Sequence, residues 1–319
     1  MADSATLPRP VIPKKPGRWL GLSRLERREA LLFYLLISPW LFNFLVLSLG
    51  PVVSALYLSL TKYDIVNPPT FVGLANYQQL FSGDPLFLQS LKVTAIWVFA
   101  GVPLRLIAAL LFAVLLNQKI MGISFFRTVF YLPSVVSGVA VALLWMWVLQ
   151  PQFGLLNYFL GLVGIPGPLW LASPTWALPG FIVMSLWSTG ATMIIFLAGL
   201  QGIPMELYEA ASMDGADRIR QFLAITVPMI TPVILFNLVI QIINSFQVFT
   251  QAFIMTNGGP VNATLFYVLL LYRVAFQYNQ MGYASAMAWI LFIIVLALTA
   301  LVFRSSGRWV HYEGGVKGR

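Results

Sequence analysis

Charged residues are scarce in this sequence. Asp, Glu, Lys and Arg make up 9% of its 319 residues, whereas hydrophobic residues make up 59%. A typical soluble domain has about 25% charged residues. The length would allow two soluble domains, but too few charged groups are present to cover such domains on their water-facing sides. The composition therefore predicts an all-α integral membrane protein.

Other absences exclude several kinds of chemistry. The sequence has no cysteine and a single histidine, His311, which excludes disulfides, thiolate metal sites and a cysteine nucleophile. It contains no Gly-x-x-x-x-Gly-Lys-Ser/Thr phosphate loop and no dinucleotide-binding fingerprint. We therefore predict no catalytic, cofactor-binding or metal-binding residues and no enzyme activity. The net charge of +9 does not indicate nucleic acid, because the basic residues flank apolar runs and form no stripe interleaved with aromatics.

Long apolar runs recur along the chain. A membrane-spanning helix needs roughly 20 predominantly apolar residues, and a backbone in lipid must satisfy its own hydrogen bonds. The sequence predicts six spans, the first bent or ended at Gly50-Pro51: Ala30–Leu60, Val93–Leu116, Thr128–Leu149, Trp176–Leu200, Val227–Met255 and Tyr283–Phe303.

Titratable groups are almost absent from these spans. No Asp or Glu falls within them, and Arg105 is their one charged residue. Proton- and ion-coupled carriers generally need buried carboxylates or histidines, and no internal repeat of the kind common in such carriers is visible. We expect the driving force for transport to come from outside the membrane domain.

The distribution of basic residues predicts the orientation. Most of them precede the first span, lie in the loops that hold Lys119, Arg127, Arg218 and Arg220, or follow the last span. The positive-inside rule then places both termini in the cytoplasm. We expect a basic cytoplasmic tail over 1–29, with a short interfacial helix around Trp19–Arg28. A membrane domain would follow over 30–304, and a cytoplasmic tail over 305–319.

The loop between the fourth and fifth spans has a distinctive pattern. Pro204 suits the first turn of a helix, and Glu206 and Glu209 favour its positive end. Gly215 can adopt a left-handed conformation, and a second helical stretch follows from Asp217. This pattern predicts a short helical hairpin, either a knob that fits another protein or an inert helix on the membrane surface.

The same loop resembles a known motif. Glu209-Ala210-Ala211 is followed after three intervening residues by Gly215, after nine further intervening residues by Ile225, and then by Pro228. This resembles the EAA loop of binding-protein-dependent ABC permeases, with Val227 where leucine is usual. Among these permeases the chain is most similar to the sugar permeases of maltose-type systems. Segments that carry this likeness include Phe125–Thr128, Trp145–Leu149, Trp170–Ala172, Thr256–Pro260 and Gly282–Ala286.

The resemblance implies partners and roles. It implies a second permease subunit, two cytoplasmic ABC ATPase subunits, an extracytoplasmic solute-binding protein and a sugar substrate, in a prokaryotic inner membrane. It also implies that the EAA loop between spans four and five docks on the ATPase. Glu209 would pair with a basic group there, Ala210 and Ala211 would permit close approach, and Gly215 would provide the turn. The predicted coupling residues are Glu209, Ala210, Ala211, Asp214, Gly215, Ile225 and Pro228.

A stripe of amides in the fifth span is the predicted substrate path. Asn237, Gln241, Asn244 and Gln251 share one face of a helix with about 3.6 residues per turn. Neutral amides donate and accept hydrogen bonds and so suit sugar hydroxyls, although they could instead bond across neighbouring helices. Weaker candidates in the fourth span are Ser188, Thr189 and Thr192. Arg105 could also meet the substrate; the alternatives for it are a structural partner within the protein or a side chain that snorkels to the membrane surface.

Two features remain on the outer side. Asn257-Gly258-Gly259-Pro260 is a turn signal, and the resemblance implies that Gly258, Gly259 and Pro260 face the binding protein. Trp145, Trp147, Trp170 and Trp176 are expected to anchor the membrane interface.

Two alternatives to an ATP-driven sugar importer remain open. One is an importer for another solute, such as a glycerol phosphate ester, and the other is an ion-coupled carrier. An anionic solute would call for more positive charge along the path than Arg105 supplies.

Overall fold

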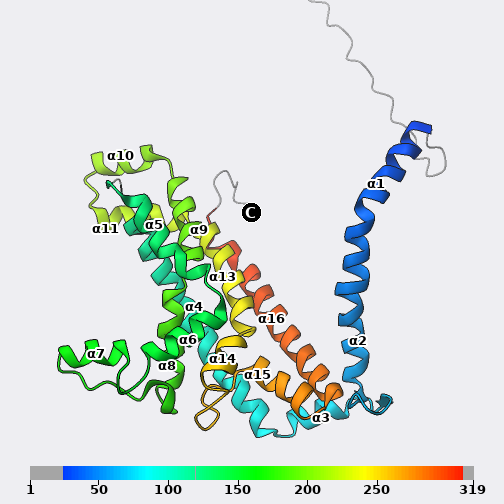
Figure 1. Ribbon diagram of the computed structural model, residues 1–319. Helices are drawn as coiled ribbons and strands as arrows, with labels where there is room; N and C mark the ends of the chain where they lie inside the picture. Colours follow the sequence, from blue (N-terminus) through cyan, green and yellow to red (C-terminus); the bar gives the residue numbers. More distant parts are fainter. Residues whose placement is uncertain (1–23, 119, 312–319) are drawn as a thin grey trace, which may run out of the picture. The chain divides into compact units, whose positions relative to one another are not determined.

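The structure is a computed structural model that describes residues 24–118 and 120–311. These residues are mostly helical (Figure 1). In chain order the elements are α1 (Arg24–Phe42), η1 (Asn43–Leu49), α2 (Gly50–Ser59), β1 (Thr61–Lys62), β2 (Thr70–Phe71), α3 (Ala75–Phe81), α4 (Pro85–Leu116), α5 (Ile123–Tyr131), η2 (Leu132–Ser134), α6 (Gly138–Val148), α7 (Leu155–Leu162), η3 (Trp170–Ala172), α8 (Ala177–Trp187), α9 (Gly190–Gln201), α10 (Met205–Met213), α11 (Arg218–Gln221), η4 (Phe222–Thr226), α12 (Val227–Met229), α13 (Thr231–Phe246), α14 (Thr250–Met255), α15 (Tyr267–Tyr272), η5 (Arg273–Gln277) and α16 (Met281–Trp309).

The chain divides into two units, residues 1–54 and 55–319. The described part of the first unit is helical throughout. The seven residues of η1 form wider π-helical turns, and the Gly50 N–H donates to the Leu45 carbonyl. Pro51 lacks an N–H and its ring crowds the preceding turn, so the helix widens before Pro51. The sequence predicted that this helix ends or bends at Gly50-Pro51. The helix instead continues without a sharp bend to Ser59.

The second unit is organised around α4. Asp84 caps this helix, since its Oδ1 accepts hydrogen bonds from the backbone N–H groups of Leu86 and Phe87. Pro85 occupies the first helical position, where its missing N–H costs nothing. The helix thus begins eight residues before the predicted Val93. It packs against α8, α9, α13 and α15, which together bury an apolar core.

Three of the predicted spans are broken, which corrects the prediction of continuous helices. α5–η2 and α6 meet at 97°, α8 and α9 at 48°, and the helical run Arg218–Met229 meets α13 at 64°. The predicted fifth span also ends early, because α13 stops at Phe246 and α14 begins only at Thr250. Within the described residues, three helices are long and apolar enough to cross a membrane, or up to six if each bent pair counts as one span.

Several short elements were not predicted. The hairpin β1–β2 pairs Thr61 with Phe71 and Lys62 with Thr70. In its loop, the backbone N–H and the side-chain amide of Asn67 both donate to Asp64, which holds the pKa of that carboxyl below its ordinary value. α15 is a short apolar helix whose first residues are buried. An apolar run of this length is too short to span and is more typical of a buried or re-entrant helix.

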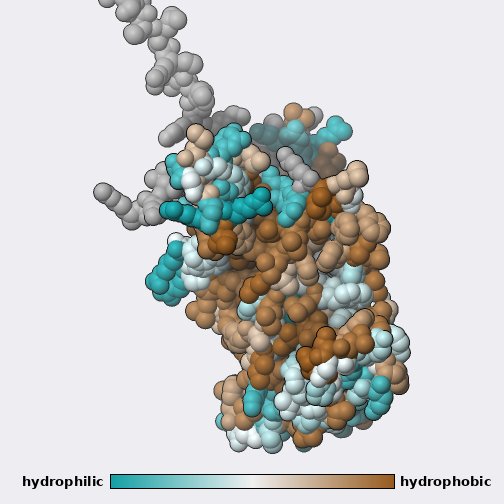
Figure 2. Space-filling view, turned by 90° about the vertical axis from the view of Figure 1, so that its left-hand side faces the viewer, coloured by the Kyte–Doolittle hydropathy of each residue, from teal (hydrophilic) through white to brown (hydrophobic). Residues whose placement is uncertain are grey.

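Polar groups gather at the ends of the second unit. In the view of Figure 2 an apolar band lies between a strongly hydrophilic end and a more mixed one. The α10–α11 hairpin, α5 and the end of α16 lie at the same end (Figure 1), and there the His311 N–H donates to Thr231 Oγ1 at 2.8 Å. The basic residues Arg127, Arg218, Arg220, Arg304 and Arg308 therefore share one end, as the sequence predicted. The predicted basic tail up to residue 23, Lys119 and residues 312–319 lie outside the described residues.

The four tryptophans that were predicted to anchor the membrane interface differ in their exposure. Trp147 and Trp176 are 52% and 44% exposed, as residues at a membrane interface would be. Trp145 and Trp170 are buried, which corrects the expectation that they anchor the interface. Trp170 Nε1 instead donates to Asn157 Oδ1 at 2.7 Å. The Asn157 amide in turn donates to the carbonyl groups of Pro151 and Pro168, so these residues fasten the segment that carries α7.

Candidate functional site

The first candidate site is the hairpin formed by α10 and α11. The two helices are joined at Gly215, whose φ of 77° is in the left-handed region. The Ala216 N–H donates to the Ala211 carbonyl and the Gly215 N–H to the Ser212 carbonyl. These two bonds are those of a Schellman motif, which commonly requires glycine at this position. The predicted turn at Gly215 is confirmed in its conformation.

Side chains brace the hairpin from within. Gln221 Nε2 donates to Ser212 Oγ and to the Ala216 carbonyl, both at 3.0 Å. Asp217 caps α11, because its Oδ1 accepts the Arg220 N–H. At the base, the hydroxyl groups of Tyr208 and Thr226 lie 2.8 Å apart. The two arms are therefore linked at both ends, by Gln221 near the turn and by Tyr208 next to the membrane domain.

The predicted coupling residues separate into two groups. Glu209, Ala210, Asp214 and Gly215 are exposed on the first arm and the turn, and Ala211 is half-buried. Ile225 and Pro228 are half-buried in η4 and α12. Exposed apolar side chains lie near the first group: Met213 is 90% exposed and Ile219 70%. The hairpin therefore exposes apolar side chains on both of its arms, and no element of the described chain covers them.

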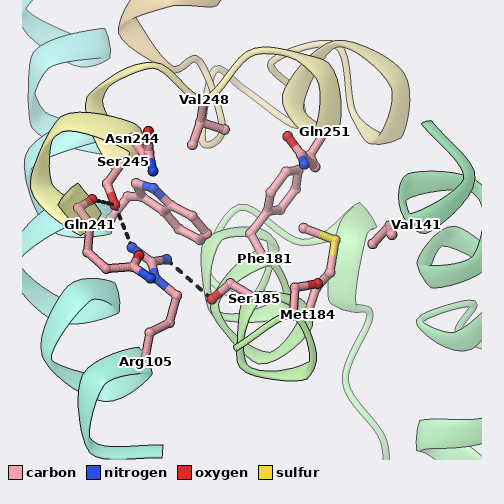
Figure 3. A pocket seen from close by; sticks show the side chains of 12 residues that line it. Arg105, Val141, Phe181, Met184, Ser185, Gln241, Asn244, Ser245, Val248 and Gln251 are labelled. Carbon is pink, nitrogen blue, oxygen red and sulfur yellow. Dashed lines mark hydrogen bonds between the residues drawn. The ribbon is translucent and has the colours of Figure 1, made fainter. Parts of the chain in front are cut away.

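The second candidate site is a cavity of about 290 Å³ inside the second unit. This is at the lower end of roughly 300–1,000 Å³ for small-molecule pockets. Its lining comes from α4, α6, α8, α13 and α14 and from the residues at the ends of α8 and α13 (Figure 3). The lining residues are Trp97, Arg105, Val141, Phe181, Met184, Ser185, Ser188, Gln241, Asn244, Ser245, Val248 and Gln251.

Three of the four amides in the predicted stripe line this cavity. Gln241 and Asn244 lie on α13, while Gln251 comes from α14, beyond a break that the prediction of one helix did not include. Gln241 Nε2 donates to Thr192 Oγ1 of α9 at 2.9 Å. The Gln241 backbone carbonyl accepts from Ser245 Oγ, whereas the side-chain oxygen Oε1 accepts no hydrogen bond within the described residues. Asn244 and Gln251 make no side-chain hydrogen bond within the described residues.

Asn237 does not join the other amides, which corrects this part of the stripe. It is 2% exposed, and its Nδ2 donates to the Val233 carbonyl of its own helix at 3.0 Å. Among the weaker candidates, Ser188 lines the cavity. Thr189 and Thr192 are buried; the Thr189 hydroxyl donates to the Leu186 carbonyl, and Thr192 accepts from Gln241.

Arg105 lies on the cavity wall and is 6% exposed. Its Nη1 donates to Ser185 Oγ at 3.3 Å and its Nη2 to Ser245 Oγ at 2.6 Å (Figure 3). Its guanidinium carbon lies 4.6 Å from the centre of the Trp97 ring. The predicted alternative, a side chain that snorkels to the membrane surface, is therefore wrong for Arg105.

Trp97, Ser185 and Ser245 also line the cavity, although they were not among the residues predicted from the sequence. Trp97, Gly101 and Arg105 are spaced by four, so they share one face of α4. A Cβ atom at position 101 would lie 3.1 Å from Arg105 Nη1, so the glycine leaves room for the guanidinium. This spacing around an intramembrane arginine was the signal available in the sequence.

The predicted outer loop is a tight turn between α14 and α15. Asn257, Gly258, Val261 and Asn262 have positive φ angles, and the Gly259-Pro260 peptide is cis. The Thr264 hydroxyl donates to the Gly259 carbonyl at 2.7 Å, and the Gln89 side chain donates to the Asn262 carbonyl at 3.1 Å. The loop is thus held to α4 at the end of the unit opposite α10 (Figure 1).

A broken-helix fold with a hairpin at one end and a central polar cavity can be compared with known proteins. The family described as "Binding-protein-dependent transport system inner membrane component" matches residues 87–310. The chain belongs to this family. Its members are transport components, so the chain is a permease and not an enzyme, as the sequence predicted.

Relatives agree over nearly the whole permease. It is 48% identical to the probable ABC transporter permease protein YesP of Bacillus subtilis over 91% of this chain and 95% of that protein. It is 34% identical to the trehalose/maltose transport system permease protein MalF of Thermococcus litoralis, over 90% and 97% of the two chains. A crystal structure of a bacterial ABC transporter involved in the import of the acidic polysaccharide alginate superposes with a TM-score of 0.76. That match is 25% identical and covers 88% of this chain and 96% of the other. The predicted family and membrane fold are confirmed.

Proposed function

We propose that this permease forms half of the translocation path of an ATP-driven sugar importer. The observation that carries the proposal is the cavity beside α13. Amides and hydroxyls of Gln241, Asn244, Gln251 and Ser188 face it, next to the rings of Trp97 and Phe181. Neutral groups that donate and accept match sugar hydroxyls, and aromatic surface suits the apolar face of a sugar ring. The sugar transporters among the relatives support the same substrate class.

Two helix breaks border the cavity. Irregular backbone at membrane depth is tolerated where it is buried in protein or lines a cavity. Two breaks, between α8 and α9 and between α13 and α14, lie next to Ser188 and Val248 of the lining. A substrate site at discontinuous helices also provides points at which the two halves of a helix can move relative to each other.

The proposal extends to the partners. A second permease would complete the path, and an extracytoplasmic solute-binding protein would deliver the sugar near Gly258, Gly259 and Pro260. The assembly would hold two ABC ATPase subunits, and the α10–α11 hairpin would dock on an ATPase. The exposed apolar side chains of Met213 and Ile219 support a docking role for the hairpin. The basic residues at the hairpin end support a cytoplasmic position for that end and for both termini, with the membrane domain over 30–304 surrounded by lipid.

Gentle detergent purification of the tagged permease from native membranes, followed by mass spectrometry, tests the assembly. We expect a second permease and an ABC ATPase to accompany the chain. Gly215→Val should reduce the recovery of the ATPase but leave that of the second permease unchanged. Recovery of the chain alone, under conditions that preserve other ABC assemblies, would contradict the proposal.

A further inference from the structure

Arg105 brings a positive charge into the cavity that no lining residue balances. The residues that line the cavity include no Asp or Glu, and the two recorded hydrogen-bond acceptors of the Arg105 side chain are the neutral hydroxyl groups of Ser185 and Ser245. A guanidinium does not deprotonate in proteins. Charged side chains are almost never this deeply buried unless they are paired. The described part of the permease thus holds a buried cation without an anion.

The remaining contacts of Arg105 do not compensate for its desolvation. Its Nε is buried with no acceptor within the described chain, and the bond to Ser185 is long at 3.3 Å. The Trp97 ring at 4.6 Å contributes a cation–π attraction. Such a contact is weak beside the desolvation cost of a buried charged group without a counter-ion. The site therefore favours an external negative group.

We propose that the cavity selects an acidic sugar, in which one ring carries an oxyanionic group that pairs with Arg105. The amides of Gln241, Asn244 and Gln251 would bind the hydroxyls of the same molecule. This inference rests on the proposed function, since it names the solute class of that importer. A single arginine is little positive charge for an exposed path, but Arg105 is buried, and a charge in surroundings of low dielectric constant acts more strongly. Carboxylate, sulfonate and phosphate groups share the required chemistry.

The experiment uses the assembled importer, with its copurified permease, ATPase and binding protein, in proteoliposomes that contain ATP. The probes are disaccharides in matched pairs. The two members of a pair differ only at C6 of one ring, which is glucose or glucuronate, galactose or galacturonate, or mannose or mannuronate. Sugar 6-sulfonates and 6-phosphates form two further arms and identify which oxyanion is accepted. Initial uptake is measured for each probe with the unaltered chain and with variants.

Two kinds of variant separate pairing from folding. Arg105→Gln should lower the uptake of an acidic sugar relative to its neutral partner by at least about 30-fold, while Arg105→Lys should retain part of the preference. Asn244→Asp leaves Arg105 in place and adds a carboxylate to the cavity, so it should lower the uptake of an acidic sugar about tenfold more than the uptake of its neutral partner. Size-exclusion profiles of each assembled variant control for folding.

The outcomes are distinct. Preference for acidic sugars that falls in both Arg105→Gln and Asn244→Asp supports the inference. Preference for neutral sugars, or equal loss of both classes in Arg105→Gln with no selective change in Asn244→Asp, overturns it. The latter result would assign the charge to a carboxylate of the partner permease. Uptake of no sugar at all would contradict the proposed function itself.

Discussion

Tyr208 of α10 and Thr226 of η4 join their hydroxyl groups at 2.8 Å, and Thr226 is buried. This bond ties the exposed arm of the hairpin to the helical run that continues towards the cavity. We expect Tyr208→Phe to reduce sugar-stimulated ATP hydrolysis and uptake. Without this bond, a movement of the hairpin would be transmitted less completely to the helices of the membrane domain. Thr226→Val, which removes the other hydroxyl, should produce the same defect. The amount of ATPase that copurifies should stay unchanged in both variants. A normal amount of sugar taken up per ATP hydrolysed in both variants would contradict this role for the bond.

Gly215 sets the turn of the hairpin through its backbone alone. Nothing lies within 4 Å of a Cβ placed there, and its φ is 77°. A left-handed conformation costs an L-residue roughly 1–2 kcal/mol, and more for a β-branched one. Uptake should therefore fall in the order Gly215→Asn, Gly215→Ala, Gly215→Val, with Val abolishing it while the protein still inserts. Gly164→Val, at a φ of 76° with no neighbours, is the matched control and should keep ATPase attachment. Normal uptake by Gly215→Val would refute the proposal.

The Gln241 side chain makes one packing bond, through Nε2, and its oxygen Oε1 accepts no hydrogen bond within the described residues. Gln241→Ala and Asn244→Ala should each weaken apparent sugar affinity about 2- to 10-fold, as expected for a lost hydrogen bond of 0.5–1.5 kcal/mol. Thr192→Val removes only the partner of the Gln241 amide, and Asn237→Ala removes an amide that does not line the cavity. Competition of labelled sugar uptake measures the affinities. Equal effects in Thr192→Val and Gln241→Ala would assign Gln241 to packing.

Gly190 permits a close helix contact. A Cβ at this position would lie 2.4 Å from the Phe130 carbonyl oxygen and 2.8 Å from Tyr131 Cα, and backbone cannot rotate away as a flexible side chain would. Gly190→Ala should destabilise the permease by about 1–3 kcal/mol and lower its unfolding temperature in detergent. Gly161→Ala, with no atom within 4 Å, should leave that temperature nearly unchanged. Equal temperatures for the two variants would show that the contact relaxes at little cost.

The sequence was informative about class and about local conformation. Apolar runs indicated the spans, and the spacing from Glu209 to Pro228 indicated the hairpin, because each depends on residues close in the chain. The breaks at Ser188 and after Phe246 could not be predicted, since they depend on what packs beside α8 and α13. Asn237 was placed with the other amides because a helical stripe cannot reveal which part of it faces a cavity. Trp145 and Trp170 were misplaced because hydropathy does not distinguish a buried ring from one at the interface.

Directional transport in proteoliposomes tests the central claim most directly. The assembled importer is reconstituted with ATP on the side of the α10–α11 hairpin and with the binding protein and labelled sugar on the other side. The account predicts accumulation of sugar on the hairpin side that requires both ATP and binding protein and that is absent with Gly215→Val. Accumulation without ATP, driven by a proton or sodium gradient, would contradict it and would identify an ion-coupled carrier.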